Sequence, residues 1–265
     1  MKPKKNLGQN FLRDEKILEK IISAADLQPD DFVIEIGPGE GVLTEELAKH
    51  AKKVIAVEID DNLVKVLRNK LRNKKNIEII NADILKIDLR QLISKFQIPN
   101  FSYKLVANLP YYITSPIIRL FLESELPPQE MILMVQKEVA ERIVARLGKM
   151  SILALSVQYY AHPELLFYVE KIAFYPVPKV DSAVIKITYN KQFTNYNRDE
   201  VKKFFRVVRA GFSAKRKILL NNLSNGFHLG KNGVEEKLKK AGISPTARAQ
   251  ELSLDDWKRL VQIFF

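Results

Sequence analysis

The chain has 265 residues, of which 46% are apolar and 28% charged, and these proportions are typical of soluble globular domains. The composition excludes collagen-like, low-complexity and disordered chains, and the absence of cysteine excludes disulfides, thiolate metal sites and cysteine nucleophiles. No apolar run reaches the roughly 18 residues of a membrane span, and the basic, polar start predicts no signal or targeting leader. We therefore expect a soluble cytoplasmic protein with no membrane partner.

Charge is unevenly distributed along the chain. The sequence carries 43 lysines and arginines against 31 aspartates and glutamates, a net charge of +12. Residues 191–265 hold 16 of the basic but only 7 of the acidic side chains, so this last quarter contributes +9. A uniformly basic surface can serve solubility alone, whereas a concentrated excess favours a segment that faces a polyanion. Nucleic acid is the leading candidate for that partner.

The first part of the chain alternates between strand-like and helix-like segments. A helix is predicted over Asp14–Ala25, with Asp14 as its cap. Five short apolar runs follow, separated by helix-compatible segments, and this order indicates βαβ units around a parallel sheet covered on both faces. The predicted strands are Phe32–Ile36, Val54–Ile59, Ile77–Asn81, Lys104–Ala107 and Met131–Val135.

The pattern changes in the second half of the chain. Two strand-like runs, Leu165–Ile172 and Ala183–Tyr189, are joined without room for a crossover helix, so we expect an antiparallel pair at one edge of the sheet. A polar linker is predicted over Tyr189–Arg198. We expect an α/β domain over residues 1–190 and a small, basic, all-helical domain over residues 191–265. The predicted helices of the second domain are Val201–Ala210, Arg216–Leu223, Val234–Ala241 and Leu254–Phe265.

Polar and glycine signals follow three successive predicted strands. Gly37, Gly39 and Gly41 lie between the first strand and the helix that follows it. This pattern is found in ligand-binding turns, and also in tight strand-to-helix connections that bind nothing. Glu58 ends the second strand 21 residues after Gly37, where an acidic side chain receives ribose hydroxyls. Asp83 ends the third, and it can accept from an adenine amino group or cap the next helix. Since ligands of open α/β sheets bind at this edge, a dinucleotide or an adenosine-containing cofactor fits.

The fourth predicted strand ends in Asn108-Leu-Pro-Tyr111, which is either a plain turn or a chemical site. The exocyclic amine of a nucleobase is a poor nucleophile because its lone pair is delocalised into the ring. An amide oxygen and a backbone carbonyl that accept its two N–H groups favour the pyramidal nitrogen of the attack, and an adjacent tyrosine supplies a stacking face. This chemistry requires no general base and no metal.

Six segments in order resemble the KsgA family of ribosomal RNA adenine N6,N6-dimethyltransferases, and the resemblance runs from end to end. Glu35–Gly41 resembles the family's S-adenosylmethionine glycine loop and Val57–Asp60 its ribose-binding acid. The other four are Asn6–Leu12, similar to the leader motif; Asn81–Leu85, similar to the adenine-contact motif; Asn108–Tyr111, similar to the catalytic motif; and Phe174–Ser182, similar to a second target-base motif.

The resemblance implies a Rossmann-like class I methyltransferase sheet, mostly parallel with an antiparallel edge strand, followed by a small all-helical domain. It also implies that S-adenosylmethionine is the cofactor and that Phe174 stacks on the target adenine. A core aromatic before a proline-rich turn is the alternative for Phe174. The implied cofactor residues are Asn10, Leu12, Gly37, Gly39, Glu58, Ile59, Asp83, Ile84 and Asn108, and the implied catalytic residues are Asn108, Leu109, Pro110, Tyr111 and Phe174.

The implied reaction is the dimethylation of two adjacent adenosines in a loop near the 3′ end of small-subunit rRNA. The implied partner is a pre-ribosomal particle, the target base is unpaired or flipped, and the enzyme is a monomer. A second branch of the family methylates one adenine of large-subunit rRNA, but Pro38, Glu40 and Leu109 depart from its pattern. An RNA-binding assembly factor is a further alternative. An NAD-dependent oxidoreductase would leave Asn108–Tyr111 unexplained.

A basic cluster stands in the predicted helical domain. It comprises Arg206, Arg209, Lys215, Arg216 and Lys217, and no acidic residue occurs from Val201 to Leu220. Such charges commonly form a solvated helix face, but the absence of counter-charge favours contacts with RNA phosphates. A second basic stretch, Lys65–Lys75, is interpreted as a solvated helix.

Overall fold

The computed structural model of the protein describes residues 3–4, 7–190 and 197–265. The chain divides into two compact units. The first contains Met1–Glu141 and Ala161–Tyr189, and the second contains Arg142–Tyr160 and Asn190–Phe265.

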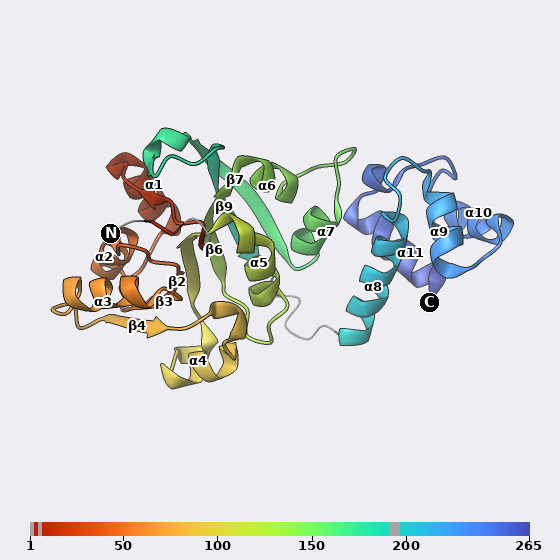
Figure 1. Ribbon diagram of the computed structural model, residues 1–265. Coiled ribbons are helices and arrows are strands. Elements are labelled where there is room, and N and C mark those ends of the chain that lie inside the picture. The colour runs from red at the N-terminus through yellow and green to blue at the C-terminus, as the bar shows by residue number, and fades with distance from the viewer. Residues whose placement is uncertain (1–2, 5–6, 191–196) are drawn as a thin grey trace. The chain divides into compact units, whose positions relative to one another are not determined.

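A seven-stranded sheet forms the centre of the first unit (Figure 1). The strand order is β4-β3-β2-β5-β6-β9-β7, and the first five strands pair in parallel. Strand β9 runs antiparallel to both β6 and β7, which confirms the mostly parallel sheet and the antiparallel pair at one edge. The bounds are β2 Phe32–Ile36, β3 Lys53–Glu58, β4 Ile77–Asn81, β5 Lys104–Asn108, β6 Glu130–Gln136, β7 Ala161–Val169 and β9 Ser182–Tyr189.

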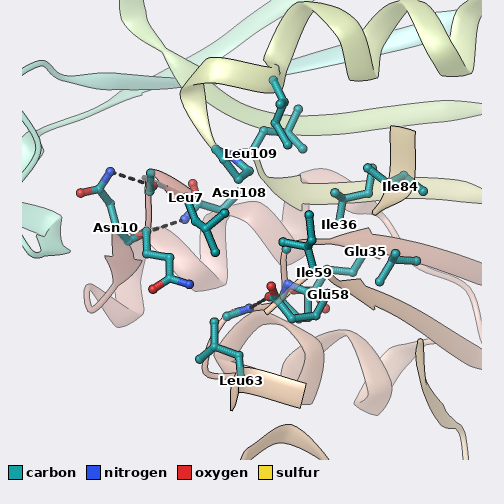
Figure 2. Close-up of a pocket in the computed structure, with 18 of the residues that line it drawn as sticks. Leu7, Asn10, Glu35, Ile36, Glu58, Ile59, Leu63, Ile84, Asn108 and Leu109 are labelled. Atoms are coloured by element: carbon teal, nitrogen blue, oxygen red, sulfur yellow. Dashed lines mark hydrogen bonds between the residues drawn. The ribbon is translucent and has the colours of Figure 1, made fainter. Parts of the chain in front are cut away.

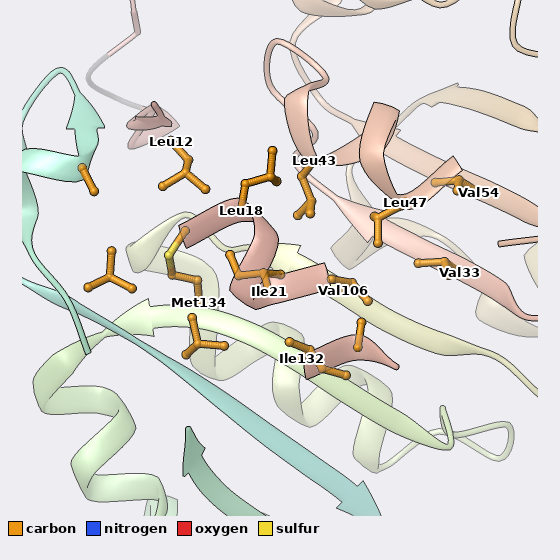
Figure 3. Close-up of a cluster of buried hydrophobic side chains, with 14 of the residues drawn as sticks. Leu12, Leu18, Ile21, Val33, Leu43, Leu47, Val54, Val106, Ile132 and Met134 are labelled. Carbon is orange, nitrogen blue, oxygen red and sulfur yellow. The ribbon is translucent and has the colours of Figure 1, made fainter. Parts of the chain in front are cut away.

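Helices alternate with these strands, as the sequence predicts. Helix α1 begins where expected because the Asp14 carboxylate accepts hydrogen bonds from the backbone N–H groups of Lys16 and Ile17. Its apolar face, with Leu18 and Ile21, joins a buried cluster with Leu47 and the central strands (Figure 3). The bounds are α1 Glu15–Ala25, α2 Val42–His50, α3 Asp61–Lys70, α4 Leu89–Lys95, α5 Thr114–Leu122 and α6 Lys137–Ile143.

A small second sheet was not predicted. Strand β1 (Phe11–Leu12) pairs antiparallel with β8 (Phe174–Tyr175), so that Phe11 lies opposite Tyr175 and Leu12 opposite Phe174. The backbone N–H of Arg13 adds a hydrogen bond to the carbonyl of Ala173. This pairing ties the leader segment to a part of the chain more than 160 residues away.

The second unit is helical. All four predicted helices form, but α9 begins at Leu219 and not at Arg216, because residues 213–217 form a turn in which Lys217 N–H bonds to the Ala214 carbonyl. Trp257 is fully buried, and its ring stacks on Phe212. The bounds are α7 Ile152–Gln158, α8 Arg198–Gly211, α9 Leu219–Phe227, α10 Lys231–Lys240 and α11 Leu254–Phe264.

Residues 142–160 belong to the second unit, although the sequence pattern placed them in the first domain. The ring of Tyr159 lies 4.4 Å from that of Phe204, measured between centroids, and the Gln250 carbonyl accepts from Gly148 and Met150. These contacts join segments about 45 to 100 residues apart, which local patterns do not reveal. Most of the predicted linker Tyr189–Arg198 lies outside the described residues.

Candidate functional site

A pocket opens at the carboxyl ends of β2, β3, β4 and β5 in the first unit (Figure 2). The leader segment Leu7–Leu12 forms part of its wall, together with the glycine turn and the segment that follows β5. The three strand ends and the Asn108 segment therefore share one rim, as the sequence predicts.

The glycine turn shapes one side of the pocket. Gly37, Gly39 and Gly41 have φ values of 64°, 61° and 78°, the left-handed region that other residues rarely adopt. A Cβ on Gly39 would lie 3.0 Å from the Phe11 ring, whereas one on Gly37 would meet only Pro110, at 3.7 Å. At Gly37 and Gly39 the pocket is therefore lined by backbone atoms and not by side chains.

Glu58 is the acidic group at the end of β3, and only 4% of it is exposed. Its Oε2 accepts from the Gly39 N–H at 3.2 Å, and its Oε1 accepts from the Asp60 N–H at 2.9 Å. Burial raises the pKa of Glu58, although these backbone donors oppose the shift. The carboxylate is held in place by the turn that it faces.

Glu35, which sequence reasoning quoted only as part of the glycine loop, also lines the pocket. It is 2% exposed, and its Oε2 has no hydrogen-bond partner among the described residues. Burial raises the pKa of Glu35 from 4.5 to about 8, and the nearby charge of Glu58 adds to the shift. A buried carboxyl with one oxygen unpaired among the described residues, at a pocket wall, favours a cationic ligand.

Asp60 binds the leader segment through two side chains. The Lys4 ammonium lies 2.8 Å from Asp60 Oδ1, and the Gln9 side-chain amide donates to Oδ2 at 3.0 Å. Asp60 also caps α3 through the Asn62 N–H. Sequence reasoning missed this tether, since nothing local links residues 4 and 60. Asn6 of the leader motif lies outside the described residues.

Asn108 and Leu109 present two acceptors at the end of β5. Asn108 Nδ2 donates to the Asn10 carbonyl at 3.2 Å, which leaves its Oδ1 without a partner among the described residues. Leu109 N–H donates to the Met134 carbonyl at 3.1 Å, while the Leu109 carbonyl has no hydrogen bond in the same part of the structure. The Pro110 carbonyl, in contrast, accepts from the Ile113 N–H.

Tyr111 follows in a single 3-10 turn, Tyr111–Ile113. Its hydroxyl lies 2.7 Å from the hydroxyl of Ser182, the first residue of β9. Burial raises the pKa of Tyr111, so the phenol stays protonated at neutral pH. The next residue, Tyr112, lines the same pocket and is largely exposed.

Asp83 is a helix cap, one of the two roles that the sequence left open, and it also faces the pocket. It lines the pocket, and its Oδ1 also accepts from the Leu85 N–H as the cap of a 3-10 turn. Its other oxygen lies 3.7 Å from the Lys86 ammonium. Capping orients the carboxylate without covering it.

The structure brings together all predicted cofactor residues and four of the five predicted catalytic residues. Asn10, Leu12, Gly37, Gly39, Glu58, Ile59, Asp83, Ile84, Asn108, Leu109, Pro110 and Tyr111 all line this one pocket.

Phe174 is the exception, and its expected position must be corrected. It is 2% exposed, belongs to the buried cluster around α1 and does not line the pocket. Because neighbouring residues of β8 point to opposite sides, Phe174 faces the core and Tyr175, 60% exposed, faces solvent.

The predicted basic cluster lies in the second unit. Arg206 and Arg209 project from one face of α8, and the Arg206 guanidinium lies over the Phe227 ring at 5.1 Å. Lys215, Arg216 and Lys217 are exposed on the turn before α9. Within the described ranges 3–4, 7–190 and 197–265, none of the five forms an ion pair.

Two absences apply to the part of the chain that the structure describes. No group of three or more histidine, cysteine, aspartate or glutamate side chains there is arranged to hold a metal ion. None of its helices combines the length and apolarity needed to cross a membrane.

Comparison with known proteins agrees with this geometry. The sequence model of a family described as ribosomal RNA adenine dimethylase matches residues 1–265. A ribosomal RNA small subunit methyltransferase A of Dehalococcoides mccartyi is 48% identical over 98% of this chain and 88% of its own. One of Streptococcus thermophilus is 45% identical over 97% and 90%.

Two crystal structures resemble the chain over nearly its whole length. The 23S rRNA methyltransferase ErmE is 31% identical, with a TM-score of 0.76 over 96% of this chain and 99% of its own. A dimethyladenosine transferase from Plasmodium falciparum is 29% identical, with a TM-score of 0.77 over 94% and 95%.

Proposed function

Because the chain belongs to the ribosomal RNA adenine dimethylase family, we propose that it dimethylates N6 of two adjacent adenosines near the 3′ end of small-subunit rRNA. Relatives named as small-subunit methyltransferases are 45–48% identical to it, whereas the 23S enzyme ErmE is 31% identical. The observation that carries the activity is a pair of acceptors on the pocket wall, Asn108 Oδ1 and the Leu109 carbonyl, that have no hydrogen-bond partner among the described residues.

The pocket suits S-adenosylmethionine. The buried carboxyl of Glu35, whose Oε2 has no hydrogen-bond partner among the described residues, matches a ligand with cationic groups, and Glu58 at the end of β3 matches ribose hydroxyls. When bound, this cofactor supplies a methyl group already activated on a sulfonium. The residues that hold it are Asn10, Leu12, Gly37, Gly39, Glu58, Ile59, Asp83, Ile84 and Asn108.

The contribution of the chain to the reaction is alignment and hydrogen-bond acceptance. In the first transfer, Asn108 Oδ1 and the Leu109 carbonyl accept the two N–H groups of the target amine, which favours the pyramidal nitrogen that attacks. The methylated nitrogen loses one proton to water in each transfer, so the second transfer starts from an amine with a single N–H. The hydrogen bond from Asn108 Nδ2 to Asn10 fixes which end of the amide faces the amine. Tyr111 provides a ring face for stacking. Pro110, with its restricted φ, sets the direction of the chain between the acceptor at Leu109 and the ring of Tyr111.

Binding of the RNA involves the second unit, which acts as the RNA-recognition domain. Arg206, Arg209, Lys215, Arg216 and Lys217 contact phosphates, which position the substrate without reading its sequence. The substrate is the small-subunit rRNA within a pre-ribosomal particle in the cytoplasm, and the protein acts as a monomer.

Methyl transfer from labelled S-adenosylmethionine to unmethylated small and large ribosomal subunits tests the proposal, with modified bases mapped by reverse-transcriptase stops. We expect stops at two adjacent adenosines near the 3′ end of the small-subunit rRNA. Label on one large-subunit adenine would replace the proposed substrate. No label on either, together with support of subunit maturation, would replace the enzyme by an assembly factor.

A further inference from the structure

The Tyr111 hydroxyl and the Ser182 hydroxyl form a hydrogen bond of 2.7 Å between residues 71 positions apart. Ser182 is fully buried and does not line the pocket, whereas Tyr111 does. The Ser182 hydroxyl therefore reaches Tyr111 from outside the set of pocket-lining residues. No other hydrogen bond of the Tyr111 side chain occurs among the described residues.

The position of Ser182 is fixed by the sheet. As the first residue of β9 it lies opposite Gln136 in β6 and opposite Val169 in β7, so both neighbouring strands hold it. The preceding residue, Asp181, accepts through its carbonyl from the Lys137 N–H and through its carboxylate from the Lys171 N–H, both at 3.0 Å. Three segments thus meet at this end of β9.

The backbone around Tyr111 has fewer contacts with the sheet than Ser182 has. It opens a single 3-10 turn, and the backbone of its segment is joined to the sheet through the Leu109 N–H and the Met134 carbonyl. That bond fixes the acceptor at Leu109 but not the position of the tyrosine ring two residues later. The hydrogen bond of the phenol hydroxyl to Ser182 holds the far end of the ring and so fixes the direction of the ring axis.

We propose that Ser182 is a positioning residue that holds the Tyr111 ring in the position from which its face stacks on the target base. This inference rests on the proposed function. It also gives the segment Phe174–Ser182 a part in the reaction that does not need Phe174 to leave the core. The segment acts through its last residue, which contacts Tyr111.

A double-mutant cycle tests the inference. Ser182→Ala and Tyr111→Phe each remove one half of the bond while keeping the ring, and we expect each to lower kcat by about fivefold to tenfold with the Kd of S-adenosylmethionine unchanged. The double variant should lose no more than either single variant, because both remove the same interaction. Losses that multiply, or a wild-type kcat in Tyr111→Phe, would overturn the proposal.

A second readout does not depend on activity. In protein with 13C-labelled tyrosine rings, the signal absent from Tyr111→Phe identifies Tyr111, and we expect Ser182→Ala to shift or broaden it. Thr188→Val, which removes a hydroxyl near the other end of β9, is the matched control and should leave it unchanged. An unmoved Tyr111 signal in Ser182→Ala overturns the inference, whereas absent methyl transfer by the wild type overturns only the proposed function.

Discussion

The pocket wall and the basic turn at Lys215–Lys217 are built in opposite ways. In the pocket, Glu58 is buried and both of its carboxylate oxygens accept backbone N–H groups, from Gly39 and Asp60. On the turn, three exposed cations have no ion-pair partner within residues 3–4, 7–190 and 197–265. Buried, hydrogen-bonded groups select a ligand by shape and are little affected by salt, whereas exposed cations attract phosphates and are screened. Changes in the two regions should therefore have separable effects.

The largest effect is expected in the pocket, where Asn108→Ala should lower kcat. The variant loses the Oδ1 acceptor for the attacking amine, and removal of one such group costs about 10²- to 10³-fold in kcat. Single-turnover transfer of labelled methyl groups measures the loss. Asn73→Ala, at an exposed amide in a remote turn, is the control and should keep the wild-type rate. A rate near wild type in Asn108→Ala would remove the residue from the mechanism.

Alanine substitutions at two glycines, one in each unit, test whether the two units unfold independently. An alanine at Gly211 would place Cβ in steric overlap with the buried ring of Trp257, so Gly211→Ala should destabilise the second unit by about 3 kcal/mol. Gly41→Ala acts on the first unit, through a φ of 78° and a Cβ 2.6 Å from Leu67. Urea titration followed by fluorescence of Trp257, the sole tryptophan, reports the second unit, and cofactor binding reports the first. If each variant shifted both probes equally, the two units would fold as one.

Most of the fold is predictable from local patterns. Asp14 caps a helix because its side chain reaches backbone two and three residues ahead, and Glu58 reaches the pocket because a strand ends there. Such constraints act over a few residues, so periodicity and turn chemistry reveal them. The pocket residues at successive strand ends follow, since the parallel sheet gathers those ends at one edge.

The contacts that escaped prediction join distant segments. The pairing of Leu12 with Phe174 buries a ring that motif resemblance placed against the substrate, and two-residue strands leave no periodic signal. The ion pair between Lys4 and Asp60 also leaves no local signal, because it joins residues 56 positions apart. The raised pKa of Glu35 arises from burial on all sides, which a glycine motif does not encode.

Neutralising the basic turn should give a smaller effect, and only on RNA. Replacing Lys215, Arg216 and Lys217 together by glutamine should weaken RNA binding by about tenfold at physiological salt. The slope of log K against log salt should fall by roughly two units. Filter binding across a salt series measures both. The matched control removes the same charge from the first unit, at Lys65, Arg68 and Arg72, which we interpret as a solvated face. Equal losses in both triple variants would show that net charge alone attracts the RNA.

The smallest effect is expected from pH, and it is confined to the pocket. Because burial raises the pKa of Glu35 to about 8, the free protein holds this carboxyl protonated at neutral pH. Binding of a cationic cofactor favours the ionised form and releases the proton, so affinity should rise about fivefold between pH 6.5 and 8. Glu35→Gln should show a flatter profile, because Glu58 alone remains to titrate beside it.

Folding stability should change with pH in the opposite sense. The stability that protonated Glu35 contributes is fully present below pH 4.5 and is lost as the pH rises through 8, since the folded state binds the proton more tightly than the unfolded chain. The wild type should therefore lose stability relative to Glu35→Gln as the pH rises from 5 to 8. Calorimetric titration and thermal unfolding at matched pH values measure the two trends. Parallel pH profiles for both proteins would mean that Glu35 does not change its charge in this pocket.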